Sequence, residues 1–324
     1  MSVHIERARD SAKAGFRRQP AEAKKRPVPI FRLLAALLAL TVTAPAAAYW
    51  DYTHRLIASI AWKEVQPETR AKLRALLREG HRLDTPECPT ATLEEASVWA
   101  DCIKPMGDRF SYQNSWHYQN VNICKPFSLR EACKDGNCVS AQIERNARLL
   151  ADPKLPTRER VMALAYLAHF VGDLAQPMHG GDRSDRGGND LPLSYGAVSG
   201  RANLHSVWDG WLAERAVTTP PGGAAGLLGE LSPAQKAELA AGTAEDWSRD
   251  AWENARTHAY TTALGNPCRE IAKGERPVLS EAQVQALIPA VRRQVLAGGL
   301  RLARMLDDAL LRGVAPERRR GGGE

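Results

Sequence analysis

Residues 159–174 read ERVMALAYLAHFVGDL, and this stretch decides the fold. Apolar side chains recur on all sides of a helix drawn through it, a pattern typical of a helix buried at the centre of a domain. Pro177 stops the helix, because proline cannot continue one. His169 and Asp173 stand four residues apart near its end, on one face. A charged carboxylate there is costly unless a cation meets it.

Helical spacing also dominates the rest of the chain, and strand signals are nearly absent. The apolar pattern predicts further helices after Pro67, over 140–151, over 203–215 and from the capping box at Ser280 to Leu311 with a kink at Pro289. A polar, glycine-rich segment, 180–201, is expected to be a long loop, and 217–231 a linker. We therefore predict an all-α fold, a single globular multi-helix domain over 49–312.

The composition separates a leader from the rest of the chain. Of 324 residues, 44% are hydrophobic and 25% charged, which fits neither a disordered chain nor a polytopic membrane protein. The net charge of +7 arises mostly in residues 1–48, which hold nine Lys/Arg and three Asp/Glu and leave 35 against 34. There, cations precede an apolar run, 33–42, and then Ala46-Ala47-Ala48, the order of a signal peptide.

We accordingly predict a signal peptide over 1–48, cleaved near Ala48, and a secreted or periplasmic protein. A retained membrane anchor is the weaker alternative, because the apolar run is about half of the roughly 20 residues that span a bilayer. The basic and glycine-rich end of the chain, 313–324, is expected to be a disordered tail.

All six cysteines follow the predicted cleavage site, and their number is even, as in exported proteins with disulfides. Three disulfides are therefore expected, although fifteen pairings exist in principle. Cys133 and Cys138 flank Lys-Asp-Gly-Asn, a turn-forming tetrapeptide that brings two sulfurs together. Metal ligation by cysteine is the alternative, but no Cys-x-x-Cys occurs.

Histidines and aspartates recur together in this chain. Two pairs stand four residues apart, and the set comprises His54, Asp101, His117, His169, Asp173, His179, His205 and Asp209. Any one of them alone is more often a hydrogen-bonded core residue or an ion pair. Together these nitrogen and oxygen donors indicate a multinuclear metal site, with zinc as the ion and carboxylates as bridges. The free amine and carbonyl of Tyr49, five residues before His54, offer a further chelate.

These residues, in this order, resemble a known family. From Tyr49 to about Cys268 the chain is similar to the trinuclear-zinc single-strand nucleases and 3′-nucleotidases, often called the S-one/P-one nucleases. The motifs are Tyr49 with His54, ASVWAD (96–101), HY (117–118), HFVGDLAQPMH (169–179) and NLHSVWD (203–209). Members usually begin with Trp, whereas the spacing of five selects Tyr49 here. Cleavage after Tyr49, with Trp50 as the ligand, is the alternative.

The resemblance implies three Zn²⁺ at the base of a cleft. The first would be held by Asp101, His117, His169 and Asp173, and the second by His179, His205 and Asp209. The third would be held by the amine and carbonyl of Tyr49, His54 and Asp173. For the cysteines the resemblance implies Cys124–Cys268 and Cys133–Cys138, which leaves Cys88 and Cys102 to pair.

The resemblance also implies residues that act on the substrate. Asp101 would orient the attacking water, and Lys104 would meet the phosphate, unless it is an ordinary surface lysine. Tyr118 occupies a base-stacking position. Asn120 stands where several members carry Asp to hydrogen-bond a base edge.

We therefore expect a zinc-dependent hydrolase that cuts single-stranded RNA or DNA to 5′-phosphate products and also acts as a 3′-nucleotidase. Its partners would be single-stranded nucleic acid or nucleotides, with no stable membrane anchor, and the protein would be a monomer. One alternative is a related zinc-dependent phospholipase C. The other is a non-catalytic exported protein that binds zinc or nucleic acid.

Overall fold

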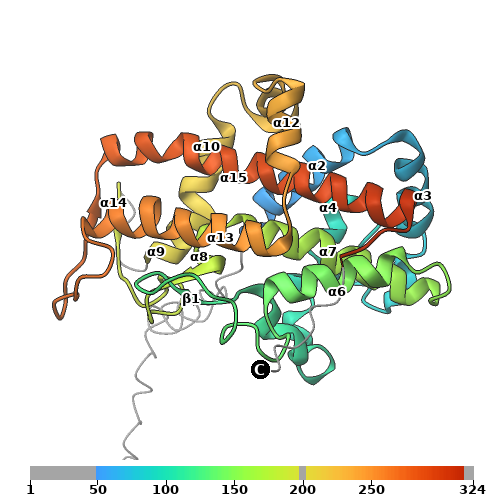
Figure 1. Cartoon of the computed structure of the whole chain (residues 1–324), viewed down its shortest axis with the longest axis horizontal. Helices are drawn as coiled ribbons and strands as arrows, with labels where there is room; N and C mark the ends of the chain where they lie inside the picture. The colour runs from blue at the N-terminus through green and yellow to red at the C-terminus, as the bar shows by residue number, and fades with distance from the viewer. Residues whose placement is uncertain (1–48, 197–201, 317–324) are drawn as a thin grey trace, which may run out of the picture. The chain divides into compact units, whose positions relative to one another are not determined.

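Helix α7 (Thr157–Ala175) is the helix that the sequence predicts over 159–174, and it runs among the other long helices (Figure 1). Every residue from Ala163 to Ala175 is buried, as the apolar pattern on all its sides requires. It packs against three long helices, α2 (Asp51–Glu64), α6 (Val139–Ala151) and α15 (Glu281–Asp307). Helix α7 is therefore enclosed by other helices on several sides.

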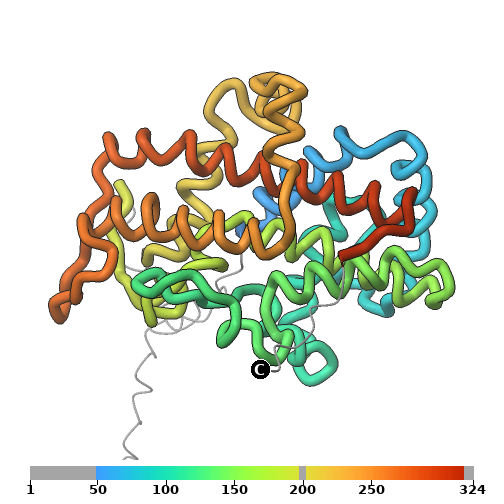
Figure 2. Tube along the Cα trace, viewed as in Figure 1, coloured from blue at the N-terminus to red at the C-terminus, as the bar shows by residue number. Residues whose placement is uncertain are grey.

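The computed structural model describes residues 49–196 and 202–316. The predicted signal peptide, 1–48, lies outside the described residues, as do 197–201 of the long loop and 317–324 of the predicted tail. The first described helix, α2, and the last long one, α15, lie side by side, so the two ends of the described chain close around one core (Figure 2).

Shorter helices complete the core. The α-helices are α3 (Pro67–Leu77), α4 (Leu93–Ala96), α5 (Trp99–Cys102), α8 (Pro177–Gly180), α9 (Leu204–Ser206), α10 (Leu212–Thr218), α11 (Gly223–Gly229), α12 (Pro233–Ala240), α13 (Ala244–Asn254) and α14 (Thr261–Leu264). The 3₁₀ and π segments are η1 (Gly80–Leu83), η2 (Lys104–Arg109), η3 (Ser111–His117), η4 (Val207–Trp211), η5 (Ala255–Tyr260) and η6 (Asp308–Arg312).

The strands are only two residues long. β1 (Val121–Asn122) pairs in parallel with β2 (Gly181–Asp182), and β3 (Ser194–Tyr195) pairs in parallel with β4 (Val278–Leu279). The prediction of an all-α fold is confirmed. The β1–β2 pair nevertheless matters for the site, because it joins the segment after His117 to the segment after His179.

Two predicted segments differ in detail. The expected linker 217–231 contains helix α11, so that prediction was wrong, and Leu227 and Leu228 of α11 are buried. The helix predicted over 203–215 forms as a continuous run of α9, η4 and α10, with a π-helical turn in its middle. The capping box at Ser280 opens α15 as expected, and the helix continues through Pro289.

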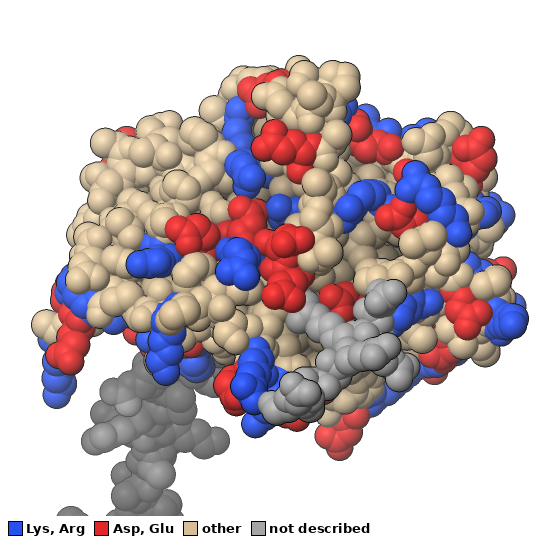
Figure 3. Space-filling model, in the orientation of Figure 1, with Lys and Arg blue, Asp and Glu red and all other residues tan. Residues whose placement is uncertain are grey.

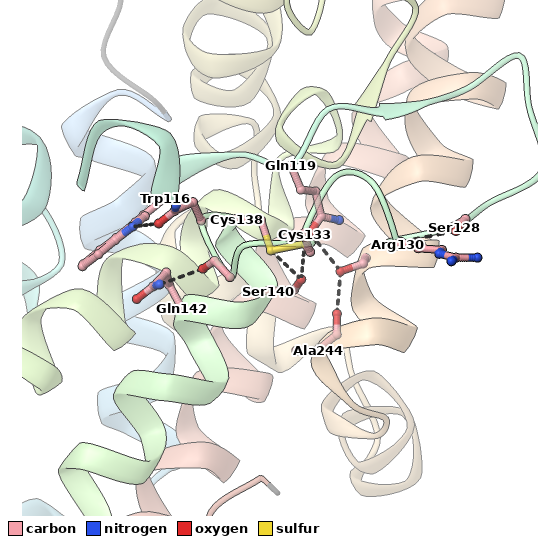
Figure 4. The surroundings of a disulfide bond; sticks show 12 residues. Trp116, Gln119, Ser128, Arg130, Cys133, Cys138, Ser140, Gln142 and Ala244 are labelled. Carbon is pink, nitrogen blue, oxygen red and sulfur yellow. Dashed lines mark hydrogen bonds between the residues drawn. A yellow bond between two sulfur atoms is a disulfide. The ribbon is translucent and has the colours of Figure 1, made fainter. Parts of the chain in front are cut away.

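The six cysteines form three disulfides with the pairing that the resemblance implies: Cys88–Cys102, Cys124–Cys268 and Cys133–Cys138. The hydroxyl of Ser140 lies within hydrogen-bond distance of both sulfurs of Cys133–Cys138 (Figure 4). Among the described residues, no helix has the length and apolar character to cross a bilayer.

The surface charges match the near-neutral balance of the chain after residue 48. On the face shown in Figure 3, Lys/Arg and Asp/Glu side chains lie intermingled rather than in a stripe of one sign. No broad basic surface is visible on this face of the described residues.

Candidate metal centre

The predicted metal ligands come from separate elements that meet at the polar end of α7. Helix α7 supplies His169 and Asp173, and the other ligands lie on α2 (His54), α5 (Asp101), the end of η3 (His117), α8 (His179), α9 (His205) and η4 (Asp209). Most of these side chains are buried, with His169, Asp173 and Asp209 at 0% exposure. They form three groups whose ligand atoms lie within 4.8 Å of one another.

The first group comprises Asp101, His117 and His169, with Asp173 beside them. Nδ1 of His117 lies 3.0 Å from Nε2 of His169, and both nitrogens lie 3.5 Å from Oδ1 of Asp101. Oδ2 of Asp173 lies 2.9 Å and 3.1 Å from the same two nitrogens. Two nitrogens and two carboxylate oxygens thus converge on one point.

Hydrogen bonds on the outer side of each ring fix which nitrogen faces this point. His169 donates from Nδ1 to the carbonyl of Ser97 at 2.7 Å, and His117 donates from Nε2 to Oε1 of Gln113 at 2.7 Å. In the neutral rings the inner nitrogens therefore present lone pairs to carboxylate oxygens. Such a meeting of acceptors is repulsive unless a cation lies between them.

The second group, His179, His205 and Asp209, is built in the same way. His179 donates from Nδ1 to the carbonyl of His117 at 2.7 Å, and His205 donates from Nδ1 to that of Gly187 at 2.8 Å. Their Nε2 atoms then face Asp209, at 3.6 Å and 2.9 Å from its carboxylate oxygens. Asp209 lies in the π-helical turn η4, and such turns are frequent at functional sites.

The third group contains His54, His169 and Asp173. Nε2 of His54 lies 3.5 Å from Oδ1 of Asp173, and the rings of His54 and His169 stack at 4.2 Å. The His54 ring occupies the space that a side chain at Gly172 would need, since a Cβ there would meet Nδ1 at 2.5 Å. Because Oδ2 of Asp173 serves the first group and Oδ1 the third, one carboxylate joins both.

Several buried ligand atoms have no hydrogen-bond partner, which tests whether the site fits a metal. They include both ring nitrogens of His54, Nε2 of His179, and one oxygen each of Asp173 and Asp209. Unpaired buried polar atoms are rare and costly in proteins. The imidazole and carboxylate donors suit a borderline divalent cation such as zinc, so these residues fit metal ions.

Tyr49 lies beside the third group. Its buried ring meets the ring of His54 edge-on, with 6.1 Å between centroids. The next residue, Trp50, donates its backbone N–H to the carbonyl of Asp209 at 3.1 Å. This bond ties the start of the described chain to the second group.

The charges of the centre shift its pKa values in opposite directions. Burial lowers the pKa of His117 to about 4. Burial also acts to lower the pKa of His179, but the carboxylates of Asp173 and Asp209 prevail and raise it to about 9. Burial opposes ionisation of Asp173 and Asp209, yet the neighbouring histidines hold both pKa values below the usual range.

Two buried glutamines also belong to the site, and the sequence prediction missed them. Gln113 accepts a hydrogen bond from Nε2–H of His117 and donates one to the carbonyl of Ala100, next to Asp101. Gln176 donates to Oδ1 of Asp209 at 2.5 Å and accepts from the N–H of Met178. Gln113 stands four residues before His117, a helical spacing that was the only available signal for it. Gln176 lies inside a motif quoted above, but nothing in the motif indicates its role.

The residues predicted to act on substrate border the centre rather than form part of it. Lys104 pairs with the carboxylate of Asp101. Tyr118, 41% exposed, and Asn120 line a cavity of about 290 Å³ together with Lys104, His117, His179 and His205. Arg186 and Asn189 of the long loop also line it. Accordingly, one cavity contains ligands from the first two groups and all three predicted substrate residues.

Known nucleases are similar to this chain in sequence over more than half of its length. Endonuclease 2 of Arabidopsis thaliana is 26% identical over 283 residues, which cover 83% of this chain and 93% of that protein. Nuclease P1 of Penicillium citrinum is 22% identical over 276 residues, with 79% and 95% covered. Nuclease S1 of Aspergillus oryzae is 25% identical over 190 residues, with 57% and 62% covered. The family model for S1/P1 nuclease matches residues 49–311, which include all three His/Asp groups, and the chain therefore belongs to the S1/P1 nuclease family.

Proposed function

We propose that this member of the S1/P1 nuclease family hydrolyses single-stranded RNA and DNA to 5′-phosphate products, and releases phosphate from 3′-nucleotides, at a centre of three zinc ions. Family membership supports the nuclease activity. The observation that carries the metal centre is the convergence of imidazole nitrogens and carboxylate oxygens in three groups, several of whose buried atoms have no hydrogen-bond partner among the described residues.

We assign the ligands as the resemblance implies. Asp101, His117, His169 and Asp173 would hold the first ion, and His179, His205 and Asp209 the second. The third would be held by His54, Asp173 and the backbone amine and carbonyl of Tyr49. The position of the Tyr49 ring against His54 supports this assignment. Trp50 is the weaker choice, because its backbone N–H already donates to Asp209.

The zinc ions would supply Lewis acidity and positive charge to a phosphodiester. Around them, this chain's own residues would bind and orient the substrate. The carboxylate of Asp101 would accept a hydrogen bond from the attacking water and so direct the lone pair of that water at phosphorus. Lys104, already paired with that carboxylate, would meet a phosphate oxygen with its ammonium group.

The rim of the cavity would select unpaired bases. Tyr118 is exposed enough for a base to stack on its ring, and stacking demands a base that is not paired in a duplex. Asn120 would hydrogen-bond a base edge, and its amide both donates and accepts. The rim therefore supports a preference for single strands over duplexes.

We further propose that the protein is exported and that removal of residues 1–48 creates the amine of the third site. The three disulfides support an oxidising compartment. Mass spectrometry of the secreted protein should show Tyr49 as its first residue. A protein that keeps one extra glycine before Tyr49 should bind two zinc ions, and three bound ions with full activity would contradict the assignment.

The central test combines metal analysis with hydrolysis. Protein that begins at Tyr49 should contain three zinc ions per chain, cut a single-stranded oligonucleotide faster than its duplex, and leave 5′-phosphates. The Asp101→Asn variant should lose turnover, whereas His258→Asn, outside the three groups, should not. Hydrolysis of lecithin without hydrolysis of nucleic acid would overturn the proposal in favour of a phospholipase.

A further inference from the structure

A second cavity adjoins the one beside the metal centre. It has a volume of about 460 Å³, within the range of small-molecule sites, and we call it the amide groove after Gln119, Asn120, Asn122 and Asn137 in its lining. Tyr118 and Asn120 border both cavities. None of the predicted metal ligands lines the amide groove. It therefore begins beside the predicted base-stacking residue and contains no part of the metal centre.

The walls of the amide groove are fixed by covalent and backbone links. One wall is the segment after His117, which β1 joins to β2 and the disulfide Cys124–Cys268 ties down further along. The other contains the turn closed by Cys133–Cys138 (Figure 4). The N–H of Val139 donates to the carbonyl of Tyr118 at 3.2 Å and joins the two walls. A groove held in this way is formed before any ligand arrives, which lowers the entropy cost of binding.

The amide orientations make this groove rich in hydrogen-bond donors. Oδ1 of Asn137 accepts from Nε1 of Trp116 at 3.1 Å, and Oδ1 of Asn122 accepts from the backbone N–H of Cys124 at 2.8 Å. Both partners are donors only, so the orientation of each amide is unambiguous. Their –NH₂ groups have no hydrogen bond within the described chain, and Lys125 adds an ammonium group to the same lining.

The apolar part of the lining complements these donors. Val121, Pro126 and Ala132 lie in the wall beside the exposed ring of Tyr118. A planar ligand edged with acceptor atoms and attached to an anion matches such a surface, and a nucleotide is of this kind. Glu131, the acidic residue of the lining, balances Lys125 and disfavours simple anions without a base.

We propose that the amide groove is a second nucleotide subsite, which binds the nucleotide on the 5′ side of the one stacked on Tyr118. This inference rests on the proposed function, in which the 3′-oxygen of the stacked nucleotide faces the metal centre. The 5′ part of the strand then leads away from the metals. The amide groove borders Tyr118 and contains no metal ligand, so it is placed to receive this part of the strand. The –NH₂ groups of Asn122 and Asn137 bind acceptors on the base, and Lys125 binds the connecting phosphate.

Two substrates separate this subsite from the metal centre. Thymidine 3′-phosphate fills only the cavity beside the metals, whereas the dinucleotide TpTp, with a 3′-terminal phosphate, adds one nucleotide on the 5′ side. Initial release of inorganic phosphate by zinc-loaded protein gives kcat/KM for each. We expect kcat/KM for TpTp to exceed that for thymidine 3′-phosphate by at least about fivefold, the effect of roughly one hydrogen bond.

Two variants test whether the higher kcat/KM for TpTp arises from binding in the amide groove. Asn137→Asp keeps the acceptor for Trp116 but replaces the –NH₂ donor, and Lys125→Gln removes the ammonium group. Each should lower kcat/KM for TpTp at least about threefold and leave thymidine 3′-phosphate unchanged. Lys134→Gln is the matched control, because Lys134 is exposed in the same disulfide turn but does not line the groove. It should change neither value.

The outcomes distinguish the two proposals. Equal kcat/KM for both substrates in the wild type, or an equal loss on both substrates in the two variants, would overturn the second subsite while the nuclease assignment stands. If zinc-loaded wild type releases phosphate from neither substrate and cuts no single-stranded oligonucleotide, the proposed function fails and the subsite fails with it. Unchanged hydrolysis of thymidine 3′-phosphate also shows that each variant is folded.

Discussion

The metal centre and its rim meet at two consecutive residues, His117 and Tyr118, which differ sharply. His117 is 2% exposed and bonded on its outer side, whereas the ring of Tyr118 is 41% exposed. The predicted ligands lie mostly on helices, and hydrogen bonds to carbonyls or amides orient four of the five histidines. The histidines predicted to hold metal are therefore oriented before any ligand binds, whereas the ring predicted to recognise the substrate remains accessible to solvent.

Of the substitutions proposed, loss of the shared Asp173 carboxylate should lower nuclease activity the most and should affect the metal centre rather than its rim. In Asp173→Asn, one oxygen of a carboxylate that joins two groups is lost. We expect nuclease activity to fall on the order of 10³-fold or more, together with a loss of bound metal. Oligonucleotide hydrolysis and metal analysis measure both. Full zinc content with normal turnover would contradict the shared role.

The stability of metal-free protein should depend on pH through His179. Its pKa is raised from 6.5 to about 9, so the folded state binds the proton more tightly than the unfolded state does. This contribution is fully present below pH 6.5 and is lost as the pH rises through about 9, an upper limit of about 3 kcal/mol. In the proposed zinc-loaded protein, the metal ion would take the place of that proton.

Urea unfolding of chelator-treated and zinc-loaded protein between pH 6.5 and 9 checks this prediction. The metal-free midpoint should fall with rising pH, and the loaded midpoint should not follow it. His169, whose pKa the carboxylates of Asp173 and Asp101 also raise, acts in the same direction, and His117 does not mask the trend, because its pKa of about 4 confines its effect to acid. Parallel curves for the two forms would refute the role of His179 and His169.

The glutamines that orient the ligands should have an intermediate effect. Gln176→Leu removes the amide that donates to Asp209 and should lower metal affinity or activity about 10- to 100-fold. Competition with a zinc-selective chelator measures the affinity. Gln235→Leu, on the exposed helix α12, is the control and should leave affinity unchanged. A normal zinc affinity in Gln176→Leu would show that Asp209 needs no such support.

Loss of the stacking ring should have the smallest effect and act on a different parameter. Tyr118→Ala should lower kcat/KM for single-stranded DNA about tenfold, mainly through KM, because stacking is worth about 1–3 kcal/mol per base. Bound zinc should stay constant. Tyr52→Ala removes another exposed ring, on α2, and serves as the control. If Tyr118→Ala instead loses metal, the rim and the centre are not separable.

Helix α7 and the two His–Asp pairs could be predicted from the sequence, whereas two glutamines of the site and helix α11 could not. Helical periodicity revealed α7, and the spacing of four in His169–Asp173 and His205–Asp209 placed each pair on one face, as the structure has it. Gln113 and Gln176 were missed because a spacing of four before His117, for Gln113, and a place inside a motif, for Gln176, do not by themselves indicate an amide that orients a ligand. The sequence prediction missed helix α11 because its glycines and the preceding prolines disfavour a helix. In the structure, the burial of Leu227 and Leu228 outweighs that low helix propensity.

The two oxygens of Asp173 imply that the occupancies of neighbouring metal groups are linked. Oδ2 faces the first group and Oδ1 the third. An ion bound at one group would therefore reduce the negative charge that attracts an ion to the other, and it would also hold the Asp173 carboxylate in position for that second ion. The reduced charge opposes a second ion, whereas the alignment of the carboxylate favours it. Zinc titrations should therefore show interaction between these two occupancies, and a chelator that withdraws one ion should change the release rate of its neighbour.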